Sequence, residues 1–144
     1  MHKIVHQMTF WLLLGITTQA GAEDRVVYDI SLHKPEEIRA LLERIEKSTS
    51  SPRSKQNHPS IALVLHGPEV DMFTIKNYRQ YQDIVDKAAR LDALGQIEVK
   101  MCRTKMGELH LTEQDIPAFI ETVPYGPDEA ARLEKEKGYK RYQF

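Results

Sequence analysis

The stretch IALVLHG, residues Ile61–Gly67, decides the fold that the sequence predicts. It begins with five consecutive apolar residues, which is the length of a typical strand. Uninterrupted apolar runs of this length are typical of strands that are covered on both faces, as in parallel sheets flanked by helices. We therefore expect Ile61–Gly67 to form a strand inside such a sheet, with His66 at its carboxyl end.

The residues before this stretch predict a strand followed by a helix. Arg25–Leu32 (RVVYDISL) is rich in β-branched residues and ends at a polar break. Pro35 suits the first position of a helix, and two glutamates follow it. The apolar residues after them recur with the spacing of one helical face: Ile38, Leu41, Leu42 and Ile45. The segment Lys47–Ser60 is polar and rich in serine and proline, so we expect a surface loop there.

The residues after Ile61–Gly67 again predict a helix followed by a strand. Asn77–Leu94 has a helical apolar face, and Gly95 stands where a helix would end. That face contains Tyr78, Tyr81, Ile84, Val85, Ala88 and Leu91. Gln96–Cys102 (QIEVKMC) is expected to be a third strand and Phe119–Pro124 a fourth.

The last part of the chain predicts one more helix and one more strand. The helix starts at Gly126 and ends at Gly138, and Tyr139–Phe144 resembles an edge strand. Strands that alternate with helices indicate βαβ units. The sequence therefore predicts an α/β protein, a three-layer α/β/α sandwich around a mainly parallel sheet of about five strands.

The first residues predict export. Met1–Ala22 contains Lys3, an apolar run over Met8–Ile16, and the small residues Ala20-Gly21-Ala22 of a signal-peptidase site. The run is shorter than the roughly 20 residues of a transmembrane helix. We expect a cleaved signal, a periplasmic or secreted location, and a single domain over residues 23–144 that does not bind the membrane. The alternatives are an uncleaved signal anchor and a helix of the fold.

Composition narrows the classes of function. The net charge is −1, and a nearly neutral balance argues against nucleic acid as the main partner. Neither a G-x-G-x-x-G fingerprint nor a P-loop occurs in the chain, so the sequence predicts no nucleotide and no other cofactor. Cys102 is the only cysteine, which excludes an internal disulfide.

Two predicted strands end in residues that carry chemistry. Ligands of open α/β sheets bind beyond the carboxyl ends of the strands. Cys102 stands at such an end, before a short predicted helix that holds Arg103 and Lys105. The helix dipole and these cations would stabilise a thiolate, the form needed for nucleophilic sulfur chemistry. The alternative is a buried free cysteine that acts as a small hydrophobic residue.

Nearby polar residues are weaker candidates. His66 is a candidate base or ligand partner, the alternative being a histidine bonded to the backbone at a strand end. Glu69 and Asp71 are expected to be solvated loop acids. His110 precedes Thr112, which is expected to cap a short helix. Cys102, His66 and His110 lack a recognised ligand spacing, so we expect no metal site.

Four segments together resemble the DsrE/DsrF-like family, particularly its small exported members. They are IALVLHGPEVDMF, IEVKMCRTKM, VPYGPDEAARLEKEKGY and the closing aromatic strand. The resemblance covers nearly all of Val26–Tyr142. It implies a three-layer sandwich around five parallel strands, and assembly as a homo-trimer or homo-hexamer. It also implies a cysteine that carries sulfane sulfur as a persulfide, and Cys102 falls at that position.

The leading hypothesis is therefore a sulfur-handling protein. Cys102 would take sulfur from a sulfane donor and pass it to the thiol of a partner protein. Arg103 would hold the thiolate, Thr104 would bond the sulfur or cap the helix, and His66 would move protons. The second hypothesis is a non-enzymatic oligomeric module that binds a small ligand or a protein in the same crevice. A thiol sensor is less favoured because the chain holds no resolving cysteine.

Overall fold

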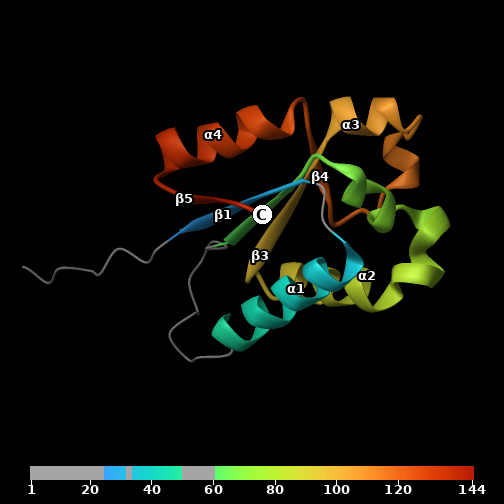
Figure 1. The fold of residues 1–144 in the computed structure, drawn as a ribbon, viewed down its shortest axis with the longest axis horizontal. Helices are drawn as coiled ribbons and strands as arrows, with labels where there is room; N and C mark the ends of the chain where they lie inside the picture. Colours follow the sequence, from blue (N-terminus) through green and yellow to red (C-terminus); the bar gives the residue numbers. More distant parts are fainter. Residues whose placement is uncertain (1–24, 32–33, 50–60) are drawn as a thin grey trace, which may run out of the picture.

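A parallel sheet of five strands forms the centre of the described part of the protein (Figure 1). The computed structural model describes residues 25–31, 34–49 and 61–144. The strands are β1 (Val26–Ile30), β2 (Ile61–Leu65), β3 (Ile97–Cys102), β4 (Glu121–Val123) and β5 (Lys140–Gln143). Their order is β4-β3-β2-β1-β5, and every neighbouring pair is parallel. The predicted α/β sandwich with a parallel sheet is confirmed.

Helices cover both faces of the sheet. The helices are α1 (Pro35–Thr49), α2 (Tyr78–Ala93), α3 (Arg103–Glu108) and α4 (Gly126–Lys137), with 3-10 helices η2 (Pro68–Phe73), η3 (Ile75–Asn77) and η4 (Glu113–Asp115). Helices α1 and α2 lie on one face and α4 lies on the other (Figure 1).

The direction of the chain across the sheet explains this division. From β1 to β4 each connection steps toward the same edge, whereas α4 leads back across the sheet to β5. Crossovers between parallel strands are almost always right-handed, so a connection that runs in the opposite direction crosses the opposite face. Helix α4 is thereby the helix that covers the far side of β1, β2 and β3.

The ends of the helices agree with the sequence in most places. Helix α4 ends at Gly138, whose φ of 73° is the left-handed conformation that favours glycine. The predicted loop begins too early, because α1 continues to Thr49, whose hydroxyl donates to the Ile45 carbonyl at 2.9 Å. The rest of that loop, residues 50–60, and the predicted signal lie outside the described residues. None of the helices in the described ranges is both long enough and apolar enough to span a membrane.

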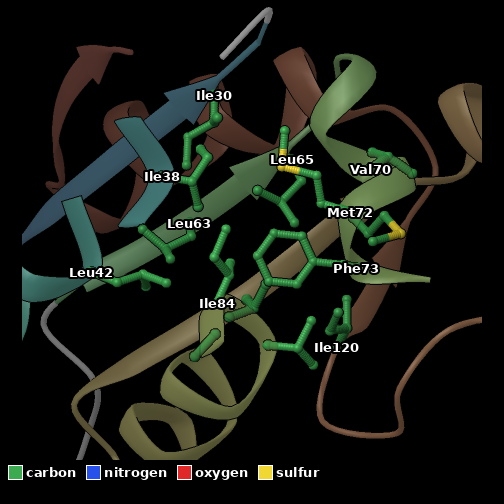
Figure 2. Packing of buried hydrophobic residues seen from close by; sticks show 14 of the residues in the cluster. Ile30, Ile38, Leu42, Leu63, Leu65, Val70, Met72, Phe73, Ile84 and Ile120 are labelled. Atoms are coloured by element: carbon green, nitrogen blue, oxygen red, sulfur yellow. The ribbon is translucent and has the colours of Figure 1, made fainter. Parts of the chain in front are cut away.

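Two hydrophobic clusters hold the layers together. The larger one lies between the sheet and α1 and α2, and Phe73 of η2 is fully buried in it. Figure 2 shows the Phe73 ring among Leu65, Ile84 and Ile120. The smaller cluster lies under α4 and comprises Val27, Ala62, Val64, Ala130, Leu133 and Tyr139. Because successive side chains of a strand alternate between faces, these clusters identify which side chains point toward α4.

Candidate functional site

Three polar or reactive side chains gather on the α4 side of the sheet, at the carboxyl ends of β1, β2 and β3. Leu65 pairs with Met101, so the next residues, His66 and Cys102, lie at the same level of neighbouring strands. Val64 belongs to the cluster under α4, and His66 shares its direction by alternation. Asp29 lies on the same side near the end of β1. The structure therefore brings His66 and Cys102 together, as the parallel sheet predicts.

Gly126 packs the first turn of α4 directly onto this pair. A β-carbon placed on Gly126 would lie 2.7 Å from the β-carbon of His66 and 3.2 Å from that of Cys102. Since both β-carbons approach one point so closely, the two side chains start as neighbours under the end of the helix. Only glycine allows the backbone to come this near. The sequence identified Gly126 only as a helix start, so its role in the site was missed.

A chain of hydrogen bonds orients the His66 ring. The Nε2 atom of His66 lies 2.5 Å from Oδ1 of Asp29, and Arg141 of β5 donates to Oδ2 through Nε, at 3.0 Å, and through Nη2. Asp29 is only 5% exposed, so its carboxylate depends on these partners. A carboxylate only accepts hydrogen bonds, so Nε2 of His66 is the donor, and in the neutral form of the ring Nδ1 is the acceptor. The ring is thus held by a carboxylate, and not by the backbone.

Glu69 corrects one prediction. It is fully buried, whereas we expected a solvated loop acid. Its Oε1 accepts hydrogen bonds from the amide of His66 at 2.9 Å and from the amide of Gly67 at 2.7 Å. The turn into η2 folds the side chain back over the end of β2, and Oε2 has no partner among the described residues. Asp71, by contrast, is partly exposed and pairs with Lys76 at 3.1 Å.

Cys102 itself is buried. It is 2% exposed and ends β3 at the N-cap of α3, a helix of six residues. Burial is what the hydrophobic alternative expects, yet Cys102 stands outside both hydrophobic clusters. Its neighbour across Gly126 is a histidine. Among the described residues, no hydrogen bond joins its Sγ atom to His66, so the pair is adjacent without being bonded.

The three residues that follow Cys102 are exposed or have partners other than the sulfur. Thr104 donates its hydroxyl to the Pro124 carbonyl at 3.1 Å, and neither to the sulfur nor to the end of α3. Lys105 pairs with Glu108 at 2.8 Å. Arg103 is exposed to solvent. The bond from Thr104 instead ties α3 to the segment that leads into α4.

His110 lies apart from this group. It is exposed on the turn after α3, with a φ of 54°. Thr112 is the N-cap residue of η4 as predicted, and its amide and hydroxyl both donate to Oδ2 of Asp115, at 2.7 and 2.8 Å. These bonds lower the pKa of the Asp115 carboxyl. Within the described ranges, no group of three or more His, Cys, Asp or Glu side chains is placed to hold a metal ion.

Comparisons with known proteins support the fold alone. No protein-family model matches the sequence, and no curated protein matches it. A solved structure with the same fold is that of MTH1491, a protein of unknown function from Methanobacterium thermoautotrophicum. The two are 14% identical with a TM-score of 0.67, over 85% of this chain and 100% of that one. At this identity the likeness concerns the architecture, and the chemistry rests on the residues described above.

Proposed function

We propose that this protein carries sulfane sulfur as a persulfide on Cys102 and transfers it to the thiol of a partner protein. One observation supports the proposal most: Cys102 and His66 lie at the same level of neighbouring strands under Gly126, and His66 is held through Nε2 by Asp29. A nucleophile beside a base, with the base oriented by a third group, is the arrangement that activates sulfur and oxygen nucleophiles. The resemblance to the DsrE/DsrF-like family supports the same chemistry.

Transfer of sulfur to Cys102 needs no reactant other than the donor persulfide. The unprotonated Nδ1 of His66 takes the thiol proton of Cys102, and the thiolate attacks the outer sulfur of a donor persulfide. A new S–S bond forms on Cys102 while the S–S bond of the donor breaks. The bonding electron pair leaves with the donor as a thiolate, which takes the proton back from His66. Attack by an acceptor thiolate on the outer sulfur of Cys102 repeats the exchange in the next protein.

The burial of Cys102 adds a requirement to this proposal. A sulfur atom that is 2% exposed is reached only when a covering segment moves. The cover is the start of α4, where Gly126 touches both side chains and Tyr125 is 47% exposed. A shift of this turn would open the thiol to a small donor, and closing it would shield the persulfide from water.

The second candidate function is a binding module that uses the same place without covalent chemistry. The same burial of Cys102 favours it, because reactive cysteines are usually partly exposed. The two functions differ in their dependence on the sulfur atom. A binding module tolerates Cys102→Ser, whereas a carrier loses all function with it.

Intact-mass measurement after incubation with a low-molecular-weight persulfide tests the proposal. We expect the folded protein to gain the mass of one sulfur atom, and Cys102→Ser to gain none. His66→Asn should slow the gain by about a hundredfold, which is the low end of what general base catalysis contributes. His110→Asn is the matched control, because His110 is exposed and lies apart from the cysteine, and this variant should react at the wild-type rate. A folded protein that gains no sulfur while the urea-unfolded chain does would favour the binding module.

Export and assembly belong to the same proposal. We propose a periplasmic or secreted protein with a mature N-terminus at Glu23, which sequencing of the N-terminus from the native host tests. We also propose a homo-trimer or homo-hexamer, as the family resemblance implies. Light scattering at micromolar concentration distinguishes these assemblies from a monomer of 16.7 kDa or less.

A further inference from the structure

A hollow lies on the α4 side of the sheet, away from the cysteine. It has a volume of about 330 Å³ and is bounded by the second half of α4, the middle of β3 and the start of β1. Four cationic side chains line it: Arg25, Lys100, Arg132 and Lys137. Leu133 and Tyr139 supply its apolar wall. The proposed sulfur chemistry uses none of these residues.

Two of the four cations form the floor and are already neutralised. Lys100 is 4% exposed, and its Nζ atom lies 2.6 Å from Glu121, 3.4 Å from Glu129 and 3.6 Å from Glu98. Arg132 donates two hydrogen bonds of 2.8 Å to the carboxylate of Glu129. A buried lysine persists only when it is paired in this way. The floor is therefore a fixed polar network that adds no net positive charge.

The other two cations stand at the rim. Within the described ranges, neither Arg25 nor Lys137 has a carboxylate partner at ion-pair distance. The guanidinium of Arg25 lies 5.9 Å from the centre of the Tyr139 ring, a cation–π contact that leaves its N–H groups available. Lys137 is the last residue of α4. Glu98 is the one carboxylate among the described residues of the lining, and it is engaged by Lys100 and by the Tyr139 hydroxyl at 3.4 Å.

We infer that this hollow binds a small organic anion. Its carboxylate or phosphate group lies between Arg25 and Lys137, and its apolar part packs against Leu133 and Tyr139. Three features together favour an anion: two cations from different parts of the chain that have no carboxylate partner among the described residues, an apolar wall, and a floor whose charges are already paired. Such a mixture of apolar surface and a few placed polar groups is typical of small-molecule sites. The inference is independent of the sulfur proposal.

Titration calorimetry with phenyl phosphate, benzoate and phenol tests it. Phenol has the same ring without the charge. We expect phenyl phosphate or benzoate to bind at least about tenfold more tightly than phenol, and the advantage to shrink in salt. Inorganic phosphate should bind more weakly than phenyl phosphate, because it has no part that contacts Leu133 and Tyr139.

Three variants locate the site. Arg25→Gln and Lys137→Gln should each weaken anion binding by about tenfold, as expected for loss of a charge-assisted hydrogen bond. Lys135→Gln, an exposed residue of the same helix that lies outside the hollow, should bind as the wild type does. Cys102→Ser should also bind normally, so the two proposals can fail separately. Equal binding of phenol, no binding of either anion, or equal weakening by Lys135→Gln overturns the inference.

Discussion

The contact between Gly126 and the two strand ends makes a quantitative prediction. Gly126→Ala adds one β-carbon, which would lie 2.7 Å from the β-carbon of His66 and 3.2 Å from that of Cys102. Carbon atoms in contact normally stand about 3.5–4.0 Å apart. Both opposing atoms are β-carbons, which cannot rotate away as the far end of a side chain can. The first turn of α4 must therefore move off the sheet by several tenths of an ångström or more.

Two opposing effects set the size of the change. Overpacking of this kind costs about 1–3 kcal/mol. Replacing glycine with alanine also restricts the unfolded chain, which stabilises the protein by about 0.4–1 kcal/mol at a compatible site. The clash is the larger effect, so Gly126→Ala should lower the free energy of unfolding, by about 1–2 kcal/mol. The alkylation rate of Cys102 should rise at the same time, because the displaced turn is its cover.

Gly107→Ala is the matched control. Gly107 lies in α3, and a β-carbon there meets nothing within 4 Å. Its replacement should leave the stability unchanged or raise it by up to about 1 kcal/mol. Urea unfolding followed by circular dichroism measures both variants, and a thiol-alkylating reagent measures access to Cys102. The reasoning is refuted if Gly126→Ala is as stable as Gly107→Ala and its thiol is no more accessible than in the wild type.

The core and the pH response give two further predictions. Phe73→Ala should lower the free energy of unfolding in urea by about 3–5 kcal/mol, because the ring is fully buried. Ile75→Ala, at a 55% exposed position, should change it by about 0.5 kcal/mol or less. Similar losses in the two variants would contradict the packing in Figure 2. The hydrogen bonds from Arg132 hold the pKa of Glu129 below 4.5, so its ion pair stabilises the fold above that pH and is lost as the pH falls through the lowered pKa. The urea midpoint should therefore fall less on acidification in Glu129→Gln than in the wild type, and parallel pH profiles would speak against it.

The elements that follow from local patterns could be read from the sequence. The apolar run of β2 and the helical spacing of apolar residues in α1 and α2 show, from a few neighbouring residues, which side chains are buried. The period of the buried residues then distinguishes strand from helix. The proximity of His66 and Cys102 followed from one topological rule, that parallel strands end at the same edge of the sheet. No knowledge of side-chain contacts was needed for it.

The missing part of the site depends on contacts between distant residues. Asp29 and Arg141 are 112 residues apart, and their ion pair exists only because β5 returns to lie beside β1. A signal was nevertheless present: an aspartate in the strand VVYDI, inside a sheet covered on both faces, requires a partner. Glu69 gave no such signal, because its burial results from the local path of η2 after the strand.

The position of β5 near the end of the sequence also affects folding during synthesis. Arg141 leaves the ribosome long after Asp29, and at about 5–20 residues per second the delay is on the order of ten seconds. Throughout this time β1 has an unpaired edge, and the aspartate destined for burial lacks its counter-ion. A nascent chain without β5 thus exposes a strand edge of the kind that other chains can add to. Completion of the sheet and completion of the histidine's support are one late event in synthesis.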